Sequence, residues 1–182
     1  MGSPKALLPY RGATFLEHLL EVTEHPRVEI TLVVLGAHVE EIRRRLRGHR
    51  ANVVVNAEWQ KGQLSSVQAA IRSLPADRTE GLILCPVDHP IISEAVVAAL
   101  IEAFDTSGKA IAAPLFRGRR GHPVIFRSTL YDELLQASPA VGARQVVWAH
   151  AHDIVEMATE EEGVLLNLND LEDLKQMERR KG

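Results

Sequence analysis

Short apolar runs alternate with helix-like segments along the whole chain, and this alternation limits the folds that are open to it. Most runs carry Val, Ile and Leu at consecutive positions, which is typical of strands covered on both faces of a parallel sheet. The alternation therefore predicts an α/β layer fold with a mostly parallel sheet. The predicted strands span residues 28–36, 52–56, 81–88, 109–114, 122–126, 153–157 and 164–168.

The segments between the runs carry the start and stop signals of helices. Thr14 and Glu17 form a capping-box pattern, and Ser93 precedes a periodic segment that ends before Gly108. Two strand-like runs flank a loop rich in Gly and Arg at residues 117–121, which predicts a hairpin-like excursion. The predicted helices span residues 14–25, 38–47, 66–74, 93–104, 128–137, 141–150 and 169–179.

Length and composition favour one ordinary globular domain over residues 1–182. The net charge of -3 gives no basic excess for nucleic acid, and no apolar stretch approaches the ~18 residues of a membrane span. We therefore expect a cytoplasmic protein that binds small molecules and neither nucleic acid nor a membrane.

Ligands of open α/β sheets gather beyond the carboxyl ends of the strands. Gly36 and Asn56 follow two of the runs, and Asp88 ends "GLILCPVDHP". A carboxylate at this edge is suited to Mg²⁺, which prefers one or two carboxylates together with substrate phosphates and water. The alternative is that Asp88 caps the helix that follows.

The stretch "VLLNLNDLEDL" repeats this arrangement near the other end of the chain. Asn167 and Asn169 follow an apolar run, and a helix pattern begins at Asp170. Asn169 is a candidate second metal ligand beside Asp88. Both asparagines are equally consistent with helix capping, for which Asn and Asp are preferred.

Two further stretches suggest phosphate contacts. In "GSPK", Gly2 permits a tight backbone path and Lys5 supplies a point charge. Gly62 is followed by Ser65 and Ser66 at the start of a helix, where backbone N–H groups attract anions. A solvated lysine and a plain helix cap are the alternatives.

The stretch "RGRRGHPV" places Arg117, Arg119 and Arg120 before Gly121, His122 and Pro123. Guanidinium groups bind carboxylates and phosphates through paired hydrogen bonds. Arg119 and the residues that follow are therefore candidates for binding an anionic second substrate. A solvated charged face is the alternative.

Taken in order, these stretches resemble the MobA-like nucleotidyltransferases, and most closely the molybdenum cofactor cytidylyltransferase branch. The stretches that carry the resemblance span nearly the whole chain: "MGSPKALLPYRGATFLEHLL", "VVLGAH", "VVNAEWQKGQLSSVQAAIRSLP", "LCPVDHPIIS", "APLFRGRRGHPVIF", "GARQVV" and "VLLNLNDLEDL". The resemblance implies a Rossmann-like three-layer α/β/α fold. It also implies Mg²⁺-dependent transfer of a nucleoside monophosphate from a nucleoside triphosphate to the phosphate of molybdopterin, with release of pyrophosphate.

Carried over to this chain, the resemblance implies that Lys5 contacts the triphosphate and Asp88 holds the metal. Gly62, Ser65 and Ser66 lie beside the nucleotide, and Gly121, His122 and Pro123 shape the acceptor side. Two departures concern the C-terminal motif, where Asn167 and Asn169 stand in place of the family's usual carboxylates. The "GSPK" stretch favours the cytidylyltransferase branch over the guanylyltransferase branch.

The family also has a strand and a Leu-Ala-Ala-Gly-type loop before the position of Lys5, and these are absent from this sequence. We therefore expect two unpaired strand edges in the middle of the sheet and uncovered apolar surface beside them. Such a surface favours self-association. The resemblance leaves two alternatives open: a guanylyltransferase of the same family, or a truncated, non-catalytic relative that binds a nucleotide or a pterin.

Overall fold

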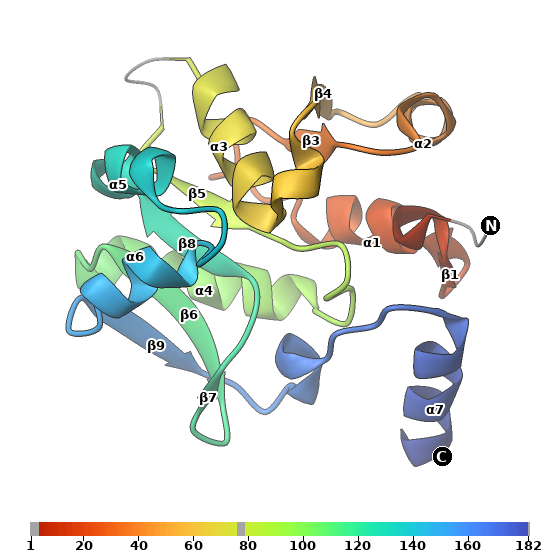
Figure 1. Cartoon of the computed structure of the whole chain (residues 1–182). Coiled ribbons are helices and arrows are strands. Elements are labelled where there is room, and N and C mark those ends of the chain that lie inside the picture. The colour runs from red at the N-terminus through yellow and green to blue at the C-terminus, as the bar shows by residue number, and fades with distance from the viewer. Residues whose placement is uncertain (1–3, 76–78, 182) are drawn as a thin grey trace.

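The computed structural model describes residues 4–75 and 79–181 as a layered α/β protein (Figure 1). Within these residues, none of the helices has both the length and the apolar character needed to cross a membrane. The strands are β1 (Pro9–Tyr10), β2 (Ala13–Thr14), β3 (Leu32–Leu35), β4 (Asn52–Val55), β5 (Gly81–Leu84), β6 (Ile111–Phe116), β7 (Arg119–Arg120), β8 (Val124–Arg127) and β9 (Ile154–Ala158). The α-helices are α1 (Phe15–Val22), α2 (Val39–Arg45), α3 (Gln63–Ser73), α4 (Glu94–Ser107), α5 (Tyr131–Gln136), α6 (Arg144–Ala149) and α7 (Leu171–Lys181), and the short 3₁₀ helices are η1 (Lys5–Leu7), η2 (Trp59–Lys61), η3 (Ser128–Leu130) and η4 (Glu162–Leu165).

The helix start signals that the sequence carries are confirmed. The Thr14 hydroxyl accepts the Glu17 amide at 3.2 Å, and the Glu17 carboxylate accepts the Thr14 amide at 2.8 Å. This capping box begins α1. The Ser93 hydroxyl accepts the Val96 amide and begins α4, and Gly108 takes the left-handed conformation that ends it.

The strand pairing is mixed rather than mostly parallel. β3 pairs with β4 in parallel and β6 pairs with β9 in parallel, whereas β8 lies antiparallel between β5 and β6. The hairpin that contains β7 explains the reversal, because a chain that returns directly after β6 must run the opposite way. The α/β prediction therefore holds, and the mostly parallel sheet is corrected.

The strand predicted at residues 164–168 is wrong. The chain forms η4 there, and its backbone bonds to loops instead of to a strand. The Val164 carbonyl accepts the His122 amide at 2.8 Å, and the Leu168 amide donates to the Asp88 carbonyl at 2.7 Å. Gly163 also packs so closely on Ile91 that a Cβ atom would lie 1.8 Å from the Ile91 carbonyl oxygen.

Helices cover both faces of the sheet and produce three layers (Figure 1). On one face, apolar side chains of α1 and α4 pack with β6 and β8 around Leu100, Phe104 and Ile125. On the other face, α3, α5 and α6 pack with the same strands around Leu64, Phe126 and Leu134. Burial on both faces explains why the predicted strands are apolar at nearly every position.

Apart from the short antiparallel pair of β1 and β2, the sheet is in two parts, and no strand within the described ranges 4–75 and 79–181 joins them. One part is β3 and β4, and the other contains β5, β8, β6, β7 and β9. Residues of β3 and of β5 line opposite sides of a cavity of about 840 Å³, which we call the inter-sheet cavity. The two unpaired edges expected in the middle of the sheet are therefore present, and self-association stays a prediction.

On both sides of the inter-sheet cavity, some backbone N–H and C=O groups of β3 and β5 point away from the strand that is paired with them. The Thr31 and Leu35 carbonyls accept the Asn52 and Asn56 amides of the β4 segment. Because successive residues of a strand direct their backbone groups to opposite edges, those of Leu32 and Val34 point to the inter-sheet cavity. On β5, the same alternation directs the groups of Gly81 and Ile83 there, since the Glu80 carbonyl accepts the Ser128 amide on the opposite edge.

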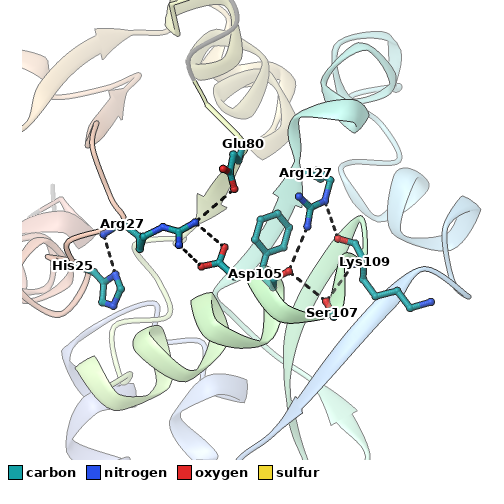
Figure 2. A network of polar contacts seen from close by, with 8 residues as sticks. His25, Arg27, Glu80, Asp105, Ser107, Lys109 and Arg127 are labelled. Atoms are coloured by element: carbon teal, nitrogen blue, oxygen red, sulfur yellow. Dashed lines mark hydrogen bonds and ion pairs between the residues drawn. The ribbon is translucent and has the colours of Figure 1, made fainter.

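Ionic contacts cross the end of the inter-sheet cavity at which β3 and β5 begin (Figure 2). The Arg27 guanidinium lies 3.0 Å from the Asp105 carboxylate of α4 and 3.6 Å from the Glu80 carboxylate before β5. Arg27 belongs to the segment that leads into β3. The contact therefore links the two parts of the sheet through side chains rather than through a strand.

Candidate active site

The polar end of the inter-sheet cavity lies at the carboxyl ends of β3 and β5, where ligands of α/β sheets bind. Four elements far apart in the sequence meet there: η1, the start of α3, the loop after β5, and the segment after η4. These four elements contribute polar side chains of Lys5, Gln63, Ser66, Asp88, His89 and Asn167 to the lining, and the connection between β7 and β8 adds His122.

Asp88 lies in the turn that follows β5 and lines the inter-sheet cavity. Its Oδ2 accepts a hydrogen bond from the Asn167 Nδ2 at 3.0 Å. The Leu168 amide holds the Asp88 carbonyl, so the segment after η4 fixes both the backbone and the carboxylate. The alternative that Asp88 caps the next helix is wrong, because Ser93 takes that position at α4.

Lys5 lines the same cavity from η1, and its Nζ donates to the Asn169 Oδ1 at 2.7 Å. The candidate metal ligand Asn169 therefore directs its amide oxygen to the ammonium group of Lys5, while Asn167 is the amide that contacts Asp88. Neither asparagine is the cap of α7, because the Asp170 carboxylate accepts the Glu172 and Asp173 amides.

The residues around Asp88 fit a magnesium ion held largely by its substrate. Among the residues that the structure describes, no three His, Cys, Asp or Glu side chains come together as a metal cluster. A carboxylate that lines the same cavity as a lysine fits the pattern of Mg²⁺ sites, in which one or two carboxylates act together with substrate phosphates. Asn167 contacts Asp88 through its Nδ2 atom, and its Oδ1 atom would be a further oxygen ligand for the metal.

The structure brings three of the candidate residues, Asn56, Ser65 and Ser66, together in a hydrogen-bonded group that we call the Asn56 network. The Asn56 Nδ2 donates to the Ser65 and Ser66 hydroxyls at 2.8 and 3.1 Å, and its Oδ1 accepts the Glu58 amide at 2.9 Å. Asn56 and Ser65 are buried, whereas Ser66 reaches the inter-sheet cavity. Gly62 precedes α3 at φ 102°, a conformation that favours glycine.

Two imidazole rings meet beside Asp88, tilted at 50° to each other. The ring centroids of His89 and His122 are 4.5 Å apart, and the Nδ1 atom of each is buried with no hydrogen-bond partner. The sequence motifs predict a site role for His122 alone. The only available signal for His89 is that it precedes a proline at the end of an apolar run, while His122 precedes one at the start of another, and this does not reveal that the rings meet.

Burial keeps both imidazoles neutral at pH 7. Burial is the main cause that lowers the pKa of His122 to about 4, with a smaller contribution in the same direction from the neighbouring His89 and an opposing one from Asp88. Burial also lowers the pKa of His89. Removing an imidazolium from water costs free energy, which is why the uncharged form persists in this position.

Of the other predicted residues, Arg119 lies away from this group, Gly121 and Pro123 flank His122 without lining the cavity, and Gly2 lies outside the described residues. Arg119 is exposed on β7 and does not belong to the cavity lining among the described residues, and the adjacent Arg120 bonds to Glu156. Gly121 packs against Val164, where a Cβ atom would lie 2.3 Å from the carbonyl oxygen, and Pro123 is fully buried. Gly2 lies outside the described residues.

Comparisons with known proteins agree with the class that this fold and site define, an α/β nucleotidyltransferase. The model of the MobA-like NTP transferase domain matches residues 1–154, and the chain belongs to this family. It resembles Rv0371c of Mycobacterium tuberculosis H37Rv, with a TM-score of 0.80 and 24% identity over 97% of this chain and 89% of that one. A manganese complex of Rv0371c matches with a TM-score of 0.77 and 25% identity over 97% and 92% of the two chains.

Two curated relatives cover most of the chain and carry different activities in their names. Nicotine blue oxidoreductase of Paenarthrobacter nicotinovorans is 28% identical over 88% of this chain and 81% of its own length. Molybdenum cofactor cytidylyltransferase of Escherichia coli strain K12 is 25% identical over 95% of this chain and 86% of its own length. The matches therefore fix the family and the fold but not the second substrate.

Proposed function

We propose that this chain transfers a nucleoside monophosphate, CMP from CTP, to the phosphate of a molybdopterin-type acceptor. The observation that carries the proposal is the meeting of Lys5, Ser66 and Asp88 in one cavity at the carboxyl ends of the strands. An oxygen of the acceptor phosphate attacks the α-phosphorus of CTP. The bond from that phosphorus to the bridging oxygen breaks, and pyrophosphate leaves with the bonding electrons.

Such a reaction needs charge neutralisation and alignment rather than a protein nucleophile. Asp88 would hold Mg²⁺, which neutralises charge on phosphate oxygens when bound. Lys5 offsets charge on the departing pyrophosphate, and its bond to Asn169 holds the ammonium group at the mouth of the cavity. The Asn56 network holds Ser66 at the start of α3, where its hydroxyl and the helix amides face the nucleotide.

The neutral imidazole pair supports an acceptor site on the β8 side of Asp88. His122 lies between Gly121 and Pro123, whose close packing fixes the ring beside the carboxylate. Arg119 lies on the solvent-exposed hairpin that carries β7, and it would contact the acceptor only from there. We therefore assign the acceptor primarily to the imidazole pair.

Removing the Asp88 carboxylate tests the proposal most directly. We expect Asp88→Ala to lower the rate of pyrophosphate release by at least about 100-fold, because charge stabilisation at the reacting phosphate is lost. The matched control is Asp132→Ala, which removes an exposed carboxylate of α5 and should keep the wild-type rate. The assay compares CTP with GTP, each with molybdopterin and Mg²⁺.

The outcomes separate the alternatives. Turnover with GTP in place of CTP would identify a guanylyltransferase. Nucleotide binding without turnover by the wild-type chain would identify a non-catalytic relative. Wild-type turnover by Asp88→Ala would remove the metal assignment.

A further inference from the structure

Trp59 is one of the most exposed large apolar side chains of the described residues. Its side chain is 44% exposed, and it lies in η2, between β4 and α3. An exposed tryptophan leaves a large apolar area in water, and indole rings are enriched where proteins bind other molecules. No motif of the sequence analysis selected this residue.

The backbone on both sides of Trp59 is held in place by the Asn56 network. The Glu58 amide donates to the Asn56 Oδ1 at 2.9 Å, and the Glu58 carbonyl accepts the Ser65 hydroxyl at 3.1 Å. On the other side, the Ser65 hydroxyl contacts the Gly62 carbonyl at 2.8 Å, and the Gly62 amide donates to the Trp59 carbonyl at 3.1 Å. The ring therefore belongs to a fixed turn rather than to a free loop.

Gly36 determines where the indole lies. A Cβ atom at Gly36 would come within 2.2 Å of the Trp59 Cβ and 2.3 Å of its Cγ, so the base of the indole rests on the glycine backbone. Gly36 follows β3, and Trp59 follows β4. The indole therefore lies at the carboxyl ends of the two paired parallel strands, the edge of an α/β sheet that binds ligands.

We propose that Trp59 is the surface on which the base of the nucleoside triphosphate stacks. This inference rests on the proposed function, because it assumes that the chain binds a nucleotide. The same network that holds the turn of Trp59 also holds Ser66, and Ser66 lines the cavity together with Lys5 and Asp88. A nucleotide with its phosphates at Lys5 and Asp88 would therefore place its base on the β3–β4 side, toward Trp59.

Stacking suits this position better than hydrogen-bond recognition. Every nucleobase has a planar face, and an indole binds that face with little dependence on which base it is. The ordered turn keeps the ring from folding away before the nucleotide arrives, which lowers the entropy cost of binding. Trp59 thus supplies affinity for the base, whereas the choice between bases lies with other groups.

The chain offers a clean optical test because it contains two tryptophans. The second, Trp148, lies on α6 at 64% exposure, and replacing it with phenylalanine leaves Trp59 as the single reporter. We expect CTP to quench the fluorescence of the Trp148→Phe protein in a saturable way. Tripolyphosphate, which has no base, should compete for the site without quenching.

A second measurement gives the size of the effect. We expect Trp59→Ala to weaken CTP binding by about 5- to 150-fold and Trp59→Phe by less, because base stacking on an aromatic ring is worth about that much. Binding of tripolyphosphate, measured by calorimetry, should stay unchanged in both variants. Equal circular dichroism of the variants establishes that the fold is kept.

Two results would overturn the inference in distinguishable ways. If Trp59→Ala binds CTP as tightly as the wild type, Trp59 does not stack on the base, and the proposed function stands. If the wild type binds neither CTP, GTP nor tripolyphosphate, the proposed function fails and this inference fails with it. A Trp59→Ala variant that loses self-association in ultracentrifugation but keeps CTP affinity would assign the ring, with the exposed Val55 nearby in sequence, to a protein contact.

Discussion

The two parts of the sheet are built very differently, although both consist of apolar strands. In the larger part, β8 and β6 are paired on both edges, and helices cover both faces. In the smaller part, β3 is paired only with β4, and its other edge faces the inter-sheet cavity. The difference shows that burial between helix layers can hold strands in position where the backbone ladder is interrupted.

The connections between the two parts are side-chain contacts. α1 contributes Leu19 to the core of the larger part and Leu16 to the core around β3. Arg27 adds ionic contacts to Glu80 and Asp105, but exposed ion pairs contribute only about 0–1 kcal/mol. We therefore expect the larger part to hold most of the stability, and the β3–β4 part to open more readily.

Matched truncations of buried leucines should give the largest difference between the two parts. Leu100 of α4 and Leu35 of β3 are both almost fully buried. We expect Leu100→Ala to lower the free energy of unfolding by about 4 kcal/mol and Leu35→Ala by about 2 kcal/mol, because Leu35 belongs to the smaller core around β3 and has fewer packing partners to lose. Urea unfolding measures both, and equal losses would contradict the comparison.

Low pH should reduce the free energy of unfolding, because the partly buried imidazole of His122 lines the inter-sheet cavity beside the larger part of the sheet. The pKa of His122 is about 4 in the folded chain against 6.5 when unperturbed, so between these values only the unfolded chain binds the proton. Stability should therefore fall by about 3 kcal/mol as the pH drops from about 6.5 to about 4, and this contribution should level off below.

The control for this pH dependence separates His122 from the other histidines. His122→Gln should remove most of the loss in urea unfolding between pH 7 and pH 4.5. His152→Gln, which changes an exposed imidazole, should keep it. A His122→Gln protein with an unchanged pH profile would show that the buried ring is not the group responsible.

The sequence predicts the helices and most strands of this fold because their signals are local. Capping side chains at Thr14 and Ser93 act within one turn, and apolar runs report burial on two faces. Residues 164–168, which are wrongly predicted to form a strand, have the same apolar character. Their backbone instead forms hydrogen bonds with Asp88 and His122 in distant loops. The composition of such a segment indicates that it is buried, but it does not indicate which groups form hydrogen bonds with its backbone.

The candidate site shows the same division. Asp88 and Asn56 are predicted from their positions at strand ends, Ser65 and Ser66 from a helix start, and Lys5 from its charge in a glycine-containing stretch, all of which a single chain segment reveals. Two other contacts depend on segments that are more than twenty residues apart in the sequence. They are the contact of His89 with His122 and the packing of Trp59 on Gly36. No local pattern encodes such a contact.

Amide hydrogen exchange gives the smallest and most local test of the comparison. The amides of Leu32, Val34, Gly81 and Ile83 face the inter-sheet cavity, whereas those of Val33, Leu35, Leu82 and Leu84 face a paired strand. We expect the first set to exchange at least about tenfold faster, which corresponds to about 1.4 kcal/mol of protection. Exchange resolved by residue in NMR spectra measures both sets in one sample.

The concentration dependence of the same exchange rates tests the predicted self-association. An unpaired edge offers N–H and C=O groups that a strand from a second copy can bind. If copies pair through β3 or β5, protection of the cavity-facing amides should rise with protein concentration, while that of the paired amides stays constant. Fast exchange at every concentration would show that these edges stay open in the monomer, and equal protection of both sets at high dilution would contradict the two-part sheet itself.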